Sequence, residues 1–316
     1  MQLHAVTMVR DEEDIIELFV RHTLSHVDKL HVAIHQSMDS TPGILGLLQK
    51  EGLPLTVRAL PDKAFRQGAT LTALARQAFD AGADVVFVID ADEFLRAPPR
   101  EALEKRLDTL PNEGVGAIPW QIYVPLPTDN QTDPNVLTRI THRPFEERKL
   151  LGKVVLTKSF ARDEAIFLLE GAHWAYQMQN GEYAPKALNV MLDIQLAHFP
   201  VRSIGQAVAK VLQRRWQRRI AWVDEPISKL VAAGFQSMVD RMTEIVLGRG
   251  TLTPQELSWF AYEYNSDYQA GDVVPLNTYE HLLVHDPVSA KPLVQRYADQ
   301  RSDPLASLYR WLDDVI

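Results

Sequence analysis

The chain contains no cysteine, so it has no disulfide, no thiolate metal ligand and no thiol nucleophile. It also lacks any apolar run near the roughly 18 residues that a membrane-spanning helix needs. Basic residues are the minority: 33 Lys and Arg against 41 Asp and Glu give a net charge of −8, which argues against a general nucleic-acid binder. The first residues turn acidic without a basic and apolar leader pattern, so we expect no signal peptide and a cytoplasmic protein.

The most informative stretch is VVFVIDADEFL at residues 85–95, where an apolar run meets Asp90, Asp92 and Glu93. Such a run predicts a strand buried on both faces, and ligands bind at the carboxyl edge of open α/β sheets. Two residues apart in extended chain, Asp90 and Asp92 point the same way, and neighbouring carboxylates favour a cation between them. Oxygen ligands of this kind suit Mg²⁺ or Mn²⁺ bound to a phosphate. The alternative is a helix cap or a solvated turn.

Strand and helix patterns alternate before this cluster. We expect strands at 3–9, 30–34, 55–60 and 85–89, with helices at 11–27, 41–50 and 67–81. The acidic residues 11–14 would occupy the first turn of the 11–27 helix, where the helix dipole favours negative charge. This alternation predicts a parallel sheet whose strands all end at one edge.

After the cluster the pattern changes. One more helix is expected at 99–110, followed by strand-like pieces at 115–124, 136–142, 153–160 and 187–198. Helical segments then follow at 204–220, 227–247, 254–264 and 304–315. We therefore predict an α/β fold with a parallel half and a mixed second half in residues 1–202, flanked by helices, and a helical C-terminal region in residues 203–316.

The helix expected at 204–220 has an apolar stripe and an opposite basic face, formed by Lys210, Arg214, Arg215, Arg218 and Arg219. In a chain of net negative charge, this face could be solvated or paired with acidic neighbours. The alternative is peripheral contact with an anionic membrane surface, at the inner face of the membrane.

Four segments resemble motifs of glycosyltransferase family 2, in the branch with an MVRNEE-like start and a DxDEF motif. They are MVRDEE at 8–13, SMDST at 37–41, DADEF at 90–94 and HFPVRS at 198–203. The resemblance covers about residues 1–203. Asp11 and Ser40 depart from the frequent Asn and Gly of the family, which weakens the assignment of the base-binding segment.

The resemblance implies a GT-A fold and a metal-dependent, inverting transfer of a sugar from a nucleoside diphosphate sugar, of UDP or GDP type, to a glycan acceptor. Asp90 and Asp92 would contact Mn²⁺ or Mg²⁺ and the sugar nucleotide. A later histidine is often a third ligand in such enzymes; we favour His173 over His198, although either could be a structural residue. Glu93 would cap or brace the loop, with metal ligation as the alternative.

The same resemblance suggests residues for the nucleotide. Asp39 would bind the base, or else form an Asx turn before the 41–50 helix. Arg10 would reach the nucleotide, or pair with the acidic residues after it. Arg66 precedes a helix N-terminus, which can bind an anion. Arg202 would bind the phosphate.

The general base must be a carboxylate near the acceptor hydroxyl. Glu170 is our choice by position, with Glu146, Glu147 and Asp193 as alternatives. Trp120 and Trp174 could stack on a sugar ring or belong to the core.

Three other classes of protein remain. A haloacid dehalogenase-like phosphohydrolase would carry its aspartates on the first strand, and a nucleotidyltransferase would have a glycine-rich basic loop where residues 10–14 are acidic. The third is a non-catalytic carbohydrate- or nucleotide-binding protein of GT-A fold.

Overall fold

The computed structural model describes residues 1–62, 64–110, 115–147, 151–221, 233–264, 274–288 and 293–315. Its helices are α1 (Ile16–Thr23), α2 (Thr41–Lys50), α3 (Gln67–Asp80), α4 (Arg100–Leu107), α5 (Val136–Arg139), α6 (Lys158–Arg162), α7 (Ile204–Ala221), α9 (Ala233–Val246), α10 (Pro254–Tyr262), α11 (Leu276–Tyr279) and α12 (Pro304–Val315), with the short 3-10 helices η1 (Glu280–Leu282) and η2 (Ala298–Gln300). Its strands are β1 (Leu3–Val9), β2 (Lys29–His35), β3 (Leu55–Leu60), β4 (Val85–Val88), β5 (Glu93–Arg96), β6 (Val115–Ile122), β7 (His142–Pro144), β8 (Gly152–Thr157), β9 (Ile166–Leu168), β10 (Ala175–Gln179), β11 (Glu182–Pro185), β12 (Leu188–Val190), β13 (Gln195–His198) and β14 (Leu283–His285).

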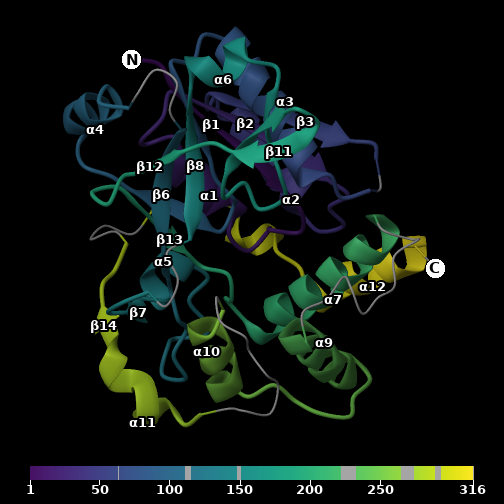
Figure 1. Ribbon diagram of the computed structural model, residues 1–316. Coiled ribbons are helices and arrows are strands. Elements are labelled where there is room, and N and C mark those ends of the chain that lie inside the picture. Colours follow the sequence, from purple (N-terminus) through teal and green to yellow (C-terminus); the bar gives the residue numbers. More distant parts are fainter. Residues whose placement is uncertain are drawn as a thin grey trace.

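One mixed sheet forms the centre of the molecule, in the order β3-β2-β1-β4-β8-β6-β13-β5, with β12 also paired to β6 (Figure 1). The first four strands in this order are parallel, and β8 runs antiparallel to both β4 and β6. The carboxyl ends of β1, β2 and β4 therefore meet at one edge, as strand–helix alternation predicts.

Helices cover both faces of this sheet. Val85 and Phe87 of β4 pack into the core shared with α1 and α2, whereas Val86 and Val88 pack into the core shared with α3 and α6. All four residues of β4 are buried, so the prediction of a strand buried on both faces is confirmed.

The predicted fold class is confirmed, and β1 and α2 have the predicted bounds. The helix expected at 11–27 is wrong at its start, because α1 begins only at Ile16 and the acidic residues before it bond to distant segments. The strand expected at 136–142 is also wrong except at its last residue, since β7 begins only at His142. There Asn135 caps the one-turn helix α5 by accepting a hydrogen bond from the Leu137 amide at 3.1 Å. The piece expected at 187–198 is two strands, β12 and β13.

Helices α7, α9, α10 and α12 share a third apolar core with the chain that follows β6 and β13, through residues such as Val124, Val201, Val208 and Leu257. β14 pairs with β7 and links this region to the sheet domain. In Figure 1 these helices lie below the sheet, on the side away from the N-terminus. They therefore stand next to the edge at which the parallel strands end.

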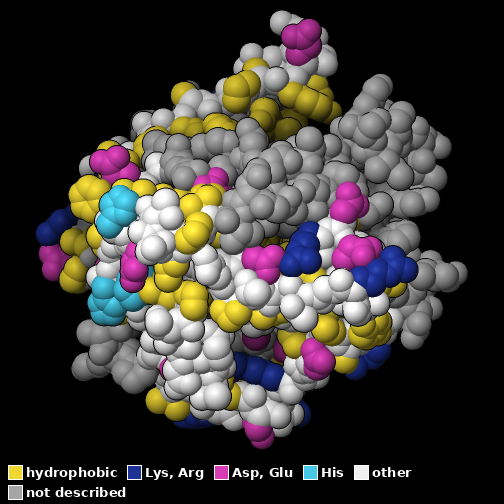
Figure 2. Space-filling model, turned by 90° about the horizontal axis from the view of Figure 1, so that it is seen from below, with side chains coloured by type: hydrophobic (Ala, Val, Ile, Leu, Met, Phe, Trp, Pro, Cys, Tyr) yellow, Lys and Arg dark blue, Asp and Glu magenta, His cyan; other side chains and the backbone are white. Residues whose placement is uncertain are grey.

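No helix in the described part of the chain is long and apolar enough to cross a membrane. On the face in Figure 2, acidic and basic side chains lie interspersed among apolar ones. On the basic face expected for the 204–220 helix, Lys210 pairs with Asp92, so the expected pairing with an acidic residue is confirmed for this lysine. The side chains of Arg214, Arg215, Arg218 and Arg219 lie outside the described residues. Membrane contact through this helix remains a prediction.

Candidate active site

The acidic cluster occupies a turn between β4 and β5. The Asp90 amide donates to Glu93 Oε2 at 2.9 Å, and the Glu93 amide donates to the Asp90 carbonyl at 3.1 Å. The extended segment expected at Asp90 and Asp92 is therefore replaced by this turn. The two aspartates have different partners as a result.

Asp90 is held by two other segments. Its Oδ1 accepts from Gln67 Nε2 at 3.1 Å, and its Oδ2 accepts from Lys153 Nζ at 2.6 Å. Lys153 is 1% exposed and also donates to the Gly171 carbonyl at 2.7 Å. Its Nζ lies 3.7 Å from Glu93 Oε1. Burial raises the pKa of Glu93 well above its ordinary value, although Lys153 opposes this shift.

Asp92 is surrounded by basic groups from the C-terminal side of the site. Its Oδ2 lies 2.5 Å from Lys210 Nζ on α7 and 3.7 Å from Arg202 Nη1, and its Oδ1 lies 3.6 Å from His198 Nε2. Burial alone would raise the pKa of Asp92, but Lys210, followed by His198 and Arg202, holds this pKa well below its ordinary value. Asp92 is therefore a buried carboxylate that stays ionised.

The described residues include one group suited to a metal ion: Asp92, Glu93 and His198, whose ligand atoms all lie within 4.8 Å of one another. Glu93 Oε1 and His198 Nδ1 are buried and make no hydrogen bond. Burial lowers the pKa of His198, which favours the neutral imidazole that binds metals. The Asp92 carboxylate, the Glu93 carboxyl group after it loses its proton, and the His198 imidazole are donors that suit Mn²⁺. The residues present thus fit a divalent ion, which would compete with Lys210 for Asp92.

His173 lies outside this group. Its Nδ1 is 2.8 Å from the Gly152 carbonyl, and its ring packs on Trp120 with centroids 4.9 Å apart. Trp120 also contacts His198 at 4.5 Å and is 8% exposed, so it belongs to the core. Trp174 is 39% exposed. The role of metal ligand predicted for His173 remains a prediction. The position of the His173 ring, outside the group formed by Asp92, Glu93 and His198, favours His198 as the third ligand.

A cavity of about 220 Å³ lies beside Lys210. It is enclosed by the loop after β1, the chain around α5, the first turns of α7 and the segment leading into α12. Charged residues of both signs line it: Arg10, Asp11, Glu12, Glu13, Asp14, Asp39, Asp133, Arg139, Lys210 and Arg301. The cavity is thus a polar site at the carboxyl edge of the sheet, next to Asp92.

Two residues predicted to bind the nucleotide line this cavity. Asp39 accepts from the Thr41 amide and the Glu13 amide, both at 2.9 Å, so the Asx turn expected as its alternative role is present. Burial, together with the charge of Asp11, raises the pKa of Asp39 to about 7. Arg10 Nε lies 3.5 Å from Asp11 Oδ2, which is the ion pair expected as its alternative role.

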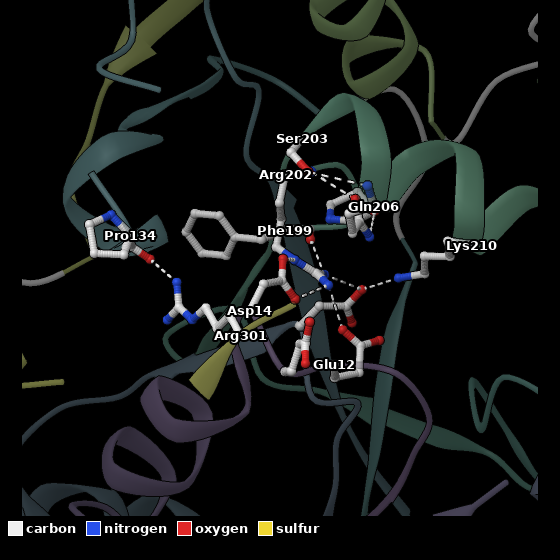
Figure 3. A network of polar contacts seen from close by, with 12 residues as sticks. Glu12, Asp14, Pro134, Phe199, Arg202, Ser203, Gln206, Lys210 and Arg301 are labelled. Carbon is white, nitrogen blue, oxygen red and sulfur yellow. Dashed lines mark hydrogen bonds and ion pairs between the residues drawn. The ribbon is translucent and has the colours of Figure 1, made fainter. Parts of the chain in front are cut away.

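Arg202 is at the centre of the network in Figure 3. It is 1% exposed and donates to Glu12, to both carboxylate oxygens of Asp14 and to the Phe199 carbonyl. Burial raises the pKa of Glu12 to about 7, although Arg202 opposes this shift. The side-chain contacts of Arg202 are thus mainly with carboxylates of the protein itself. Phosphate binding by Arg202 remains a prediction.

The remaining predicted residues lie further out. Arg66 is 71% exposed, with its Nε 3.4 Å from Asp62 Oδ2. Glu170 is exposed in the turn before Gly171, whose amide donates to Gln67 Oε1 at 3.0 Å. The residue that follows Glu170 in the chain is thus linked through Gln67 to Asp90.

The alternative bases differ in their surroundings. Glu147 Oε1 accepts from the Ile122 amide at 2.7 Å at the end of β6, and burial raises its pKa to about 7. Asp193 is 54% exposed and pairs with Arg106 of α4 at 2.9 Å. No contact of the Glu146 side chain bears on the site.

Sequence reasoning missed the two lysines on the aspartates. Lys153 stands in an apolar strand, where a buried charge needs a partner, and this signal could have found it. Lys210 belongs to a helix that reads as amphipathic, and nothing in its neighbourhood along the chain points to Asp92.

No protein-family model matches the chain, and no curated protein matches it. Solved structures do. The mannosyltransferase PcManGT from Pyrobaculum calidifontis, in complex with GDP-Man and Mn²⁺, matches with a TM-score of 0.41 and 14% identity over 80% of this chain and 77% of that chain. GalNAc-T7 with UDP, GalNAc and Mn²⁺ matches with a TM-score of 0.39 and 10% identity over 89% of this chain and 58% of that chain.

A third match is the glucosyl-3-phosphoglycerate synthase from Mycobacterium tuberculosis, with a TM-score of 0.26 and 21% identity over 38% of this chain and 44% of that chain. At these TM-scores and identities, none of the three says what this chain binds. The mixed sheet described above agrees with the α/β fold, parallel in one half and mixed in the other, that the sequence predicts.

Proposed function

We propose that this chain is a glycosyltransferase, which moves a sugar from a nucleoside diphosphate sugar to a hydroxyl group of a carbohydrate acceptor. The observation that carries this proposal is the environment of Asp92. It is a buried carboxylate that its basic neighbours keep ionised, between the ligand atoms of Glu93 and His198 and the polar cavity lined by Lys210. This place is the carboxyl edge of the sheet, where α/β proteins bind ligands.

Asp92, Glu93 and His198 would hold Mn²⁺ or Mg²⁺. When bound, the ion neutralises the diphosphate and stabilises the charge on the leaving group. The sequence predicts Asp90 and His173 as metal ligands beside Asp92, whereas we now propose Glu93 and His198 for these two positions. Asp90 instead supports the turn through Lys153 and Gln67 and keeps its predicted contact with the sugar nucleotide as a proposal.

The cavity would take the nucleoside, of UDP or GDP type. Arg10 and Asp39, which the sequence predicts to bind the nucleotide, both line it. Arg202 forms an ion pair with Asp92 at 3.7 Å. Through its hydrogen bond to Asp14 it also connects the loop after β1 to the start of α7. We therefore propose it as a positioning residue, which keeps the cavity wall and the carboxylate in place.

In the proposed reaction the acceptor oxygen bonds to the anomeric carbon, with inversion, while the bond from this carbon to the diphosphate oxygen breaks. Glu170 would take the acceptor proton, because it is exposed beside the Asp90 network. Glu147 is the alternative base, since its pKa of about 7 suits proton transfer near neutral pH. Comparing kcat of Glu170→Gln and Glu147→Gln decides between them: the variant of the base loses activity by about 100-fold or more.

The test is calorimetric titration with UDP, GDP and ADP, each with and without Mn²⁺. We expect one nucleoside diphosphate to bind with Mn²⁺, and Asp92→Asn to weaken this binding at least about tenfold. Glu101→Gln is the control, because that carboxylate is exposed and paired with Lys105 on α4. If wild-type protein binds none of the three, or Asp92→Asn binds as well as wild type, the proposed function is wrong.

A further inference from the structure

Three buried or half-buried cations surround the aspartates of the turn, and they differ in how firmly each is held. Lys153 is 1% exposed and donates to both Asp90 and the Gly171 carbonyl. Arg202 is equally buried and donates to two carboxylates and a carbonyl. Neither can leave without breaking two or more hydrogen bonds that are at least partly shielded from water.

Lys210 is different. Its side chain is 32% exposed, lines the 220 Å³ cavity and makes one described hydrogen bond, to Asp92 Oδ2 at 2.5 Å. It stands on α7, at the edge of the network in Figure 3. A lysine ammonium is a compact charge on a four-carbon stem, so rotation of this stem moves it within the cavity while the helix stays in place.

Lys210 and a divalent ion need the same carboxylate. Asp92 is one of the three ligands that fit the ion, and an ammonium within hydrogen-bond distance repels a cation bound there. A diphosphate in the cavity would bring negative charge to the side of Asp92 on which Lys210 lies. The displaced ammonium would then have a phosphate oxygen to bind.

We propose that Lys210 and the divalent ion exchange on Asp92, and that the displaced Lys210 binds the diphosphate of the donor. This inference rests on the proposed function for its second half, since only a diphosphate donor supplies the phosphate. It makes Lys210 a donor-binding residue, a role that the sequence analysis does not give it.

The first measurement is the affinity for Mn²⁺ alone, from the electron paramagnetic resonance signal of free aqueous Mn²⁺, which needs neither nucleotide nor turnover. We expect Lys210→Met to bind Mn²⁺ about tenfold more tightly than wild type, because a like charge has been removed from Asp92. Lys210→Arg keeps the charge and should stay within about threefold of wild type. Lys158→Met, which removes the exposed partner of Asp84, is the control and should change nothing.

The second measurement is the affinity for the nucleoside diphosphate at saturating Mn²⁺. Here Lys210→Met should bind about tenfold more weakly than wild type, and Lys210→Arg should retain binding. Unchanged or weaker Mn²⁺ binding by a folded Lys210→Met overturns the exchange. Tighter Mn²⁺ binding with unchanged nucleotide binding overturns the phosphate role.

A wild-type protein that binds no nucleotide overturns the proposed function together with the phosphate role. The exchange on Asp92 is judged separately, because the Mn²⁺ affinities are measured without nucleotide. Circular dichroism and urea unfolding of Lys210→Met and Lys210→Arg confirm that the compared proteins are folded. If Lys210→Met does not fold, Lys210→Arg decides: Mn²⁺ affinity shifted by tenfold or more overturns the exchange.

Discussion

Arg202 holds both carboxylate oxygens of Asp14, from Nε at 2.7 Å and from Nη2 at 2.9 Å, although 188 residues separate the two side chains. The planar fork of a guanidinium matches a carboxylate in this way, and a lysine cannot reproduce it. Through this pair the start of α7 is joined to the loop after β1. The cavity wall and the backbone of α7 are thereby held in place relative to the loop after β1.

Replacing Arg202 should therefore cost much stability. We expect Arg202→Met to lower the free energy of unfolding by about 3–5 kcal/mol, because it leaves buried carboxylates without their partner. Arg202→Lys should cost less. Urea unfolding measures both. Arg249→Met, which removes an exposed ion pair with Glu244, is the control and should change stability by less than about 0.5 kcal/mol. A loss of under about 1 kcal/mol in Arg202→Met would contradict the buried network.

Gly152 is expected to be irreplaceable even by alanine. A Cβ atom there would lie 1.9 Å from the Ile118 carbonyl oxygen of the paired strand β6, so the backbone would have to move. We expect Gly152→Ala to destabilise the protein by about 3 kcal/mol or more. Gly46→Ala, in α2 with no atom within 4 Å of its Cβ, should stabilise it by about 0.5–1 kcal/mol. Thermal or urea unfolding of the two variants compares them; equal effects would contradict the close approach.

Asp286 links β14 to the sheet domain by accepting from both Arg96 and Arg143. The hydrogen bond from Arg96 lowers the pKa of Asp286 to about 2. This lowered pKa means that the stabilisation is present above the ordinary pKa and is lost as pH falls toward 2. Asp286→Asn should cost about 1–2 kcal/mol at pH 7, after allowance for its partial exposure, and less at pH 3. Urea unfolding at both pH values, with the exposed Glu101→Gln as control, tests this. A penalty independent of pH would refute it.

The contribution of Glu147 to stability should depend on pH in the opposite direction from that of Asp286. Its pKa is raised to about 7 by burial, so its stabilising contribution is complete below pH 4.5 and is lost as pH rises through 7. Glu147→Gln keeps an acceptor for the Ile122 amide but carries no charge. We expect it to equal wild type near pH 4 and to exceed it by about 1–2 kcal/mol at pH 8. Stability curves across this range measure the difference, and parallel curves would rule out a raised pKa.

Much of the sheet domain could be predicted from short stretches of the chain. The run at β4 predicts a doubly buried strand, because apolar residues without polar interruption exclude a solvated face. The alternation before it predicts a parallel sheet whose strands end at one edge, because short strand–helix–strand units join parallel neighbours. The helix start at Ile16 was missed, because the acidic residues at 11–14 suit a helix N-terminus as well as the loop that contacts Arg202 and Ser302.

The sequence by itself determined the fold class and the acidic cluster at the end of β4, because both follow from local patterns of apolar and charged residues. Only the tertiary structure decided which cations meet that cluster. Lys210 reaches Asp92 across 118 positions, and Lys153 reaches Asp90 across 63. His198 comes to Asp92 through the pairing of β13 with β5, while His173 bonds the Gly152 carbonyl. These contacts depend on how separate elements pack, and a charge on a helix or strand carries no local sign of its distant partner.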